Sequence, residues 1–169
     1  MRTLLVLFSL CCLTTVAFSQ NYHTAKTTTE KALEAFREGQ SYMQQQESAI
    51  ALGYFEKALK ADATFIEAKL ALAETYEELR DFFKAERAYE EAIALSSDFS
   101  PVAYFFLAQV EWQNDKFDEC AQHLAAYLKT DPTNPKNKNK AERLLINARF
   151  AAEAVKKPVP FVLRNTGAG

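Results

Sequence analysis

The stretch LALAETYEELRDFFKAERAYEEAIALSSD, residues 70–98, decides the fold of this chain. Small residues stand at positions 73, 85 and 92, and aromatic residues stand at positions 76 and 89. Small residues allow two antiparallel helices to approach closely, and aromatic side chains fill the gaps between neighbouring helix pairs. The stretch therefore predicts two helices that pack against each other.

The same kinds of residue recur before and after this stretch. At a spacing of 34 the matches are Gly39 with Ala73, Tyr42 with Tyr76, Ala51 with Ala85, Phe55 with Tyr89, and Ala58 with Ala92. At a spacing of 35 they are Leu72 with Leu107, Ala73 with Ala108, Ala85 with Cys120, and Tyr89 with Leu124. One helix pair cannot bury its own apolar face, whereas three stacked pairs can, so the period predicts a repeat protein.

The spacing and the residues resemble the tetratricopeptide repeat, whose signature is L-[GA]-x2-Y, then A-x3-F-x2-A, then P within 34 residues. The copies are residues 32–65, 66–99 and 101–134. The first has Glu38 in place of Leu and Ala63 in place of Pro, and the third has Glu111 in place of Tyr. The resemblance implies an all-α fold, a right-handed α-solenoid of three tetratricopeptide helix pairs, within residues 30–157.

A further helix is expected over residues 137–157, after the third copy. Its apolar positions step by three and four, which is the spacing of an amphipathic helix. These positions are Ala141, Leu144, Leu145, Ala148, Ala152 and Val155. The stripe predicts a capping helix that covers the end of the solenoid.

Local signals predict where the other helices begin. Thr27 and Glu30 have the spacing of a capping box ahead of the first helix. Ser100 before Pro101 predicts an N-cap and a first-turn proline at the start of the third repeat. Within the second repeat, Glu86 and Glu90 are expected on the exposed face, where substitutions would do little.

The N-terminus carries the features of a secretory signal peptide. Arg2 precedes an apolar stretch over residues 4–13, and Ala17-Phe18-Ser19 forms a small-x-small cleavage site. We expect a signal peptide over residues 1–19, a mature chain from Gln20, and a disordered segment over residues 20–29. An uncleaved anchor and a lipoprotein are the alternatives.

The charge of the mature chain restricts the classes of partner it could bind, and its cysteine content restricts the disulfides it could form. Loss of Arg2 lowers Lys+Arg from 20 to 19 against 22 Asp+Glu, which takes the net charge from −2 to −3. Nucleic-acid binding has no electrostatic support at this charge. Cys120 remains as the one cysteine, so no internal disulfide forms, and no transmembrane segment is expected in the mature chain.

The sequence holds no arrangement that suggests catalysis. His23 is expected in a polar segment and His123 on the outside of a repeat helix, both without a metal or catalytic partner. Cys120 occupies a small-residue position and is expected to pack in the core. No phosphate loop, serine elbow or carboxylate pair is present, so we expect no enzyme, no cofactor and no metal.

The tetratricopeptide resemblance implies a partner-binding groove on the concave face, lined by repeat positions 2, 5, 9, 12 and 13. Counting along the chain gives Leu33, Phe36, Gln40, Met43 and Gln44, then Glu67, Leu70, Glu74, Glu77 and Glu78, then Val102, Phe105, Gln109, Trp112 and Gln113. This surface suits a basic protein or peptide with an apolar anchor. In the alternative interpretation, Glu77 and Glu78 only solvate a helix and Trp112 packs on the end helix.

Family members that grip a C-terminal carboxylate use Lys and Asn at these positions. This chain has neither residue there, which argues against that binding mode.

The C-terminal stretch resembles a junction in a family of Bacteroidota envelope proteins. There an exported tetratricopeptide domain precedes a β-propeller and an OmpA-like peptidoglycan-binding domain. Pro158-Val159-Pro160-Phe161 and Asn165-Thr166-Gly167 match that junction in order and spacing. Residues 158–169 are expected to form an extended tail or linker, with a disordered terminus as the alternative. The propeller and OmpA-like domains are absent from this sequence, so peptidoglycan binding does not carry over.

Together these features predict a non-enzymatic scaffold, exported to the periplasm or the outer-membrane periphery. The resemblance implies a role in envelope assembly or in type IX secretion and gliding. A periplasmic chaperone or assembly factor for extended peptides is the alternative.

Overall fold

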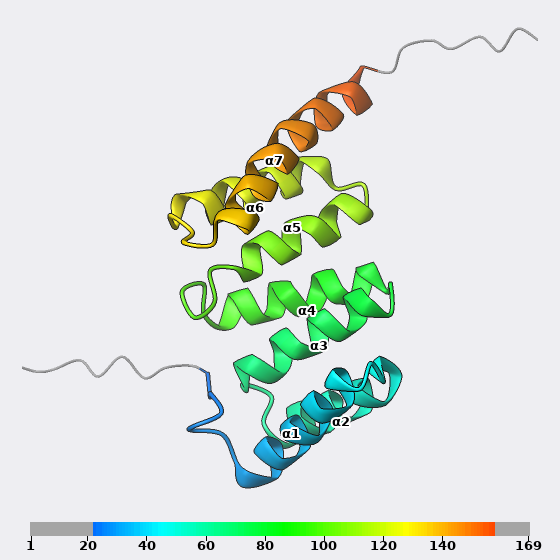
Figure 1. Ribbon diagram of the computed structural model, residues 1–169, viewed down its shortest axis with the longest axis vertical. Coiled ribbons are helices and arrows are strands. Elements are labelled where there is room, and N and C mark those ends of the chain that lie inside the picture. Colours follow the sequence, from blue (N-terminus) through cyan, green and yellow to red (C-terminus); the bar gives the residue numbers. More distant parts are fainter. Residues whose placement is uncertain (1–21, 158–169) are drawn as a thin grey trace, which may run out of the picture.

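The computed structural model describes residues 22–157 and contains seven helices. They are α1 (Glu30–Gln44), α2 (Ser48–Ala61), α3 (Ile66–Glu78), α4 (Phe82–Leu95), α5 (Ala103–Gln113), α6 (Phe117–Lys129) and α7 (Pro135–Lys156). The first six form three antiparallel pairs stacked in chain order, and α7 lies at the end beyond the third pair (Figure 1). The all-α fold predicted from the repeat is confirmed.

The turn inside each helix pair repeats the same unusual backbone geometry. Gln46, Arg80 and Asp115 have positive φ angles of 63°, 60° and 59°. In each turn the following amide donates back to a carbonyl five residues earlier, as Glu47 does to Tyr42 at 2.9 Å. This hydrogen bond is typical of an α-helix that ends with one residue in the left-handed backbone conformation. Residues other than glycine rarely adopt that conformation. The three positions are 34 and 35 residues apart, so the turns follow the period of the sequence.

Small residues lie where the paired helices cross. Ala51, Ala85 and Cys120 are fully buried at equivalent positions of the three pairs. Gly39 is the tightest point, since a β-carbon there would lie 2.6 Å from Cε1 of Phe55. The close approach that the small residues predicted is therefore present, and Cys120 packs as expected.

Two helix starts differ from the sequence prediction. The N-cap of α1 is Thr29, whose side chain accepts from the amide of Ala32 at 3.2 Å, so the Thr27–Glu30 capping box is wrong. Ser100 does not cap α5 with its side chain, because residues 101–102 form a turn whose bonds include Ala103 N–H to the Ser100 carbonyl at 2.8 Å. The segment around Pro101 thus makes a tight turn before the helix.

The prediction of disorder over residues 20–29 is wrong for the described part, residues 22–29. His23 donates its amide to the Thr64 carbonyl at 2.8 Å and accepts from the Ile66 amide at 2.9 Å, as an isolated β-bridge. Its Nδ1 lies 2.7 Å from Oδ2 of Asp62. The segment is therefore held against the α2–α3 turn by side-chain as well as backbone hydrogen bonds.

Two glutamates, Glu86 and Glu111, are buried, and each carboxylate is hydrogen-bonded to another side chain. Glu86 is 5% exposed, and its carboxylate accepts from Lys116 Nζ and, at 2.6 Å, from Asn114 Nδ2. The expectation that Glu86 faces solvent is wrong, whereas Glu90 is exposed. Glu111 is 1% exposed and faces His123, so His123 has a partner and does not point outward.

The signal peptide at 1–19 and the tail at 158–169 lie outside the described residues. Between residues 22 and 157, none of the helices combines the length and apolarity that a bilayer crossing requires.

Candidate functional site

The first repeat contributes less to the predicted groove than its sequence suggested. Phe36 is 7% exposed and packs in the core against Phe55 and Phe65, with ring centroids 5.8 and 4.9 Å away. It cannot offer a surface to a partner. Gln40 and Gln44 remain exposed on α1.

In the third repeat, too, some of the predicted groove residues are buried and others are exposed. Phe105 is 2% exposed and stacks on Tyr127 with centroids 5.3 Å apart, so it too belongs to the core. Trp112 is half-buried: it meets Phe117 edge-on at 5.0 Å and also packs against the apolar cluster to which α5, α6 and α7 contribute. Gln113 is exposed, and Gln109 is half-buried.

The carboxylate of Glu67, at the start of α3, is hydrogen-bonded to another segment of the chain. Its Oε1 accepts from the amide of Ala25 at 3.0 Å, which ties the N-terminal segment to the second repeat. Its Oε2 is buried without a hydrogen-bond partner among the described residues. Glu67 is therefore a structural group and not part of an open groove.

The remaining predicted acids gather in one place. Glu74, Glu77 and Glu78 on α3, Arg80 in the following turn, Tyr89 on α4 and Phe106 on α5 line an open hollow of about 500 Å³. We call these six residues the acidic depression. Glu74 and Glu78 are exposed, Glu77 is half-buried, and the phenol of Tyr89 donates to Oε2 of Glu77 at 3.3 Å.

Partial burial and neighbouring charges act on two carboxylates of the acidic depression, Glu74 and Glu77. Partial burial, followed by the charges of Glu77 and Glu78, raises the pKa of Glu74. Partial burial also raises the pKa of Glu77, although the Tyr89 hydrogen bond and the Lys140 charge oppose it. A cation placed between these groups would relieve both the repulsion and the lost hydration.

A cation from α7 already lies at the edge of this region. Lys140 donates to Oε1 of Gln109, and its Nζ lies 5.6 Å from the centroid of the Phe105 ring. It is also close enough to Glu77 to lower the pKa of that carboxyl. An ammonium group of the chain itself therefore lies within electrostatic reach of one carboxylate of the acidic depression.

The sequence pattern missed four contributors to this site: Arg80, Tyr89, Phe106 and Lys140. Tyr89 and Phe106 lie outside the repeat positions that the resemblance assigns to a groove. Arg80 and Lys140 come from a turn and from the last helix, which repeat counting does not reach. The cluster of three acids was the only available signal.

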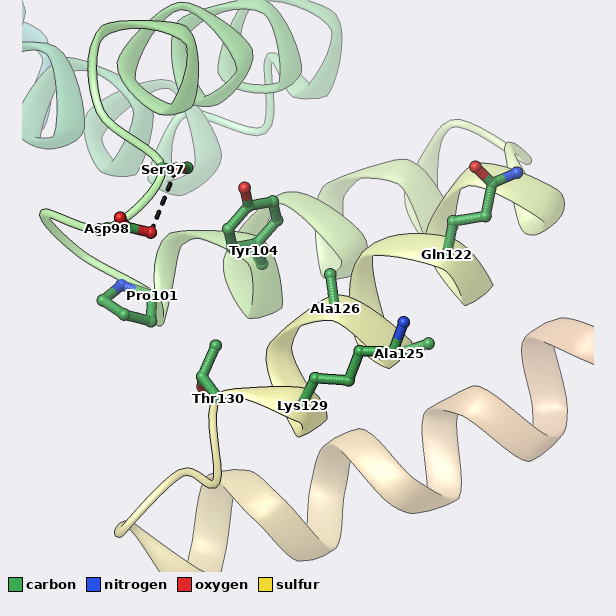
Figure 2. Close-up of a pocket in the computed structure, with 9 residues that line it drawn as sticks. All are labelled: Ser97, Asp98, Pro101, Tyr104, Gln122, Ala125, Ala126, Lys129 and Thr130. Carbon is green, nitrogen blue, oxygen red and sulfur yellow. Dashed lines mark hydrogen bonds between the residues drawn. The ribbon is translucent and has the colours of Figure 1, made fainter.

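A second hollow, on a different part of the surface, carries no comparable chemistry. It lies between the α4–α5 connection and α6, where Figure 2 shows Pro101, Tyr104 and Lys129 around the side chains of Ala125 and Ala126. The hydrogen bond drawn in Figure 2 runs from the Ser97 hydroxyl to the Asp98 carboxylate at 3.2 Å, and these two residues are neighbours in the chain. The lining offers a shallow apolar floor without a set of converging charges.

The described residues offer little for catalysis. Burial raises the pKa of the Cys120 thiol to about 12, so it stays protonated and unreactive at neutral pH. No group of three or more His, Cys, Asp or Glu side chains within residues 22–157 is arranged to hold a metal ion.

Comparison with known proteins agrees with the fold. A protein-family model described as "Tetratricopeptide repeat" matches residues 36–82 and 70–135. No curated protein sequence is significantly similar to the chain.

Several solved structures share the arrangement of helices at low sequence identity. A yeast Sti1 domain in complex with an Hsp70 peptide is 19% identical, with a TM-score of 0.64 over 72% of this chain and 98% of that one. The first such domain of Spaghetti (RPAP3), bound to the HSP90 peptide SRMEEVD, is 23% identical, with a TM-score of 0.62 over 75% and 94%. The Yersinia enterocolitica secretion chaperone SycD, with a peptide of the translocator YopD, is 13% identical, with a TM-score of 0.65 over 74% and 97%.

Proposed function

The chain belongs to the tetratricopeptide repeat family, and on that premise we propose that it binds a protein partner through an extended basic segment laid in the acidic depression. The observation that carries the proposal is the meeting of three carboxylates with the half-buried ring of Phe106, above the buried Tyr89. Carboxylates select Lys and Arg, while aromatic rings accept an apolar anchor or the face of a cation.

Lys140 supports this choice of partner. It shows that the region accommodates an ammonium group near the Glu77 carboxylate, as a basic partner would require. Replacing Lys140 with Met would remove a competing internal cation, so a basic partner should bind more tightly to the variant.

The same electrostatics disfavour acidic partners. The Spaghetti (RPAP3) structure contains a peptide ending in EEVD. A peptide with that ending would bring like charge against Glu74, Glu77 and Glu78, which costs binding free energy. We therefore place the partner of this chain in a different chemical class.

We further propose that the chain acts as an exported scaffold at the periplasm or outer-membrane periphery, in envelope assembly or in type IX secretion and gliding. The support is the signal-peptide pattern of residues 1–19 and the resemblance of the C-terminal stretch to an envelope junction. Intact-mass measurement of the exported protein tests the first part, because a mass that still includes residue 1 contradicts signal cleavage.

The binding proposal is tested with two labelled peptides that differ only in charge. One carries Lys or Arg beside Leu and Phe, and the other carries Glu at the basic positions. Fluorescence anisotropy should show binding of the basic peptide alone. Equal binding of both peptides, or of neither, contradicts the proposal, and equal binding of many unrelated unfolded chains would favour the chaperone alternative.

A further inference from the structure

The last helix does not finish the solenoid with a polar surface. One side of α7 packs on α5 and α6 through Ala141 and Ala148, which are fully buried. The opposite side leaves Ile146 69% exposed and Phe150 76% exposed. A capping helix normally presents polar residues outward, because the end of a solenoid otherwise offers a stacking face. The prediction of a simple cap over residues 137–157 therefore describes only the inner side of α7.

The exposed side of α7 has a definite charge pattern around its apolar centre. Arg143 lies one turn before Ile146 and Glu153 lies about one turn after Phe150, and all four side chains are exposed. At about 100° per residue these four positions share one helical stripe. We call Arg143, Ile146, Phe150 and Glu153 the outer stripe.

The outer stripe is complementary to itself when reversed. Ile146 and Phe150 lie two residues on either side of Ala148, and Arg143 and Glu153 lie five residues on either side of it. In an antiparallel pair of helices related by a two-fold axis beside Ala148, Ile146 of one copy faces Phe150 of the other, and Arg143 faces Glu153. The end charges are then about 7–8 Å from the axis along the helix, within reach of these long side chains.

We propose that the outer stripe is a self-association surface, whose occupant is α7 of a second copy of this chain in antiparallel orientation. Two-fold interfaces are built from one patch used twice, which is what the symmetric placement of apolar and opposite charges provides. Glu153 has Lys156 Nζ at 3.6 Å, a loose exposed ion pair that leaves its carboxylate accessible. Because one helix face buries less than the roughly 1,200 Å² of a stable interface, the dimer is weak and forms reversibly.

Sedimentation velocity of the full chain over a range of micromolar concentrations tests the proposal. The average mass should rise with concentration towards that of a dimer. Phe150→Ser should weaken the association by roughly tenfold or more, since each dimer buries two Phe150 rings, one from each copy. Phe83→Ser is the matched control, because Phe83 is 74% exposed on α4, away from the outer stripe, and its replacement should leave the association unchanged.

The charges test the antiparallel orientation separately. Arg143→Glu and Glu153→Arg should each weaken association, because each places like charges opposite each other. The double variant Arg143→Glu/Glu153→Arg should restore it to within about threefold of the parent, as expected for a pair that couples directly. Circular dichroism checks that each variant keeps its helices.

Three outcomes overturn the proposal. The first is a chain that stays monomeric at every concentration, and the second is a dimer that Phe150→Ser and Phe83→Ser affect equally. The third is a monomer that dimerises only after residues 158–169 are removed, which would assign the outer stripe to that segment.

Discussion

His123 and Glu111 are hydrogen-bonded inside the third helix pair, with Nδ1 2.8 and 2.9 Å from the two carboxylate oxygens. The carboxylate comes from the repeat position where the family signature has Tyr. Its side chain is 2% exposed, whereas that of the histidine is 30% exposed. The hydrogen bond to Glu111 raises the pKa of His123, and burial raises the pKa of Glu111.

This pair predicts that the third repeat is more stable in mild acid than in mild base. A histidine with a raised pKa stabilises the fold below its unfolded pKa of about 6.5, and that stability is lost as pH rises through the folded pKa. Thermal melts at about pH 6 and pH 8 should therefore show a higher Tm at the lower pH.

The matched variant is His123→Gln, which keeps a hydrogen-bond donor but cannot be protonated. Its melting temperature should fall, and its difference between the two pH values should shrink. A parent protein whose Tm does not change between about pH 6 and pH 8 would contradict this account of the pair.

Gly39 and Gly53 should respond in opposite ways to replacement by Ala. Both lie within helices, where Ala is favoured over Gly by about 0.5–1 kcal/mol. A β-carbon at Gly53 meets no atom within 4 Å, so Gly53→Ala should stabilise the protein. At Gly39 it would lie 2.6 Å from the buried Phe55 ring, and overpacking of that kind costs about 1–3 kcal/mol. Urea unfolding that ranks Gly39→Ala at or above Gly53→Ala would refute the close helix crossing.

Asp62 should hold the N-terminal segment in place. Burial raises the pKa of its carboxyl, but hydrogen bonds from Thr28, Thr64 and His23 outweigh that effect and lower it. The resulting stability is present above the unfolded pKa of about 3.9 and is lost as pH falls through the folded value. Asp62→Ala should increase hydrogen exchange at residues 22–28 and lower Tm. Asp98→Ala, at an exposed position, should do neither, and equal exchange in both variants would contradict the anchoring.

The sequence was sufficient for the fold because the helix pairs are specified locally. Small residues at 51, 85 and 120 recur at the repeat spacing, and each meets a neighbour in its own pair. The partners of Glu86 and Glu111 come instead from the adjacent loop and helix, 30 and 12 residues later. Their burial could have been suspected only from an acid at a core position of the signature, as at 111.

The candidate site was harder to predict, because repeat counting gives the direction of a side chain but not its exposure. Phe36 and Phe105 occupy predicted groove positions, yet both are buried against neighbouring rings. Glu67 is used by the N-terminal segment. The acids at 74, 77 and 78, by contrast, line an open hollow beside the half-buried ring of Phe106.

The salt dependence of peptide binding tests the central claim most directly. The basic peptide defined above is measured by stopped-flow fluorescence against the parent and against Glu74→Lys/Glu77→Lys at several salt concentrations. Its matched control is Glu34→Lys/Glu38→Lys, with the same change in net charge at exposed positions of α1. We expect the first variant to slow association and lose most of its salt dependence, while the control keeps both near the parental values. If both variants bind the peptide as the parent does, the acidic depression is not the binding site.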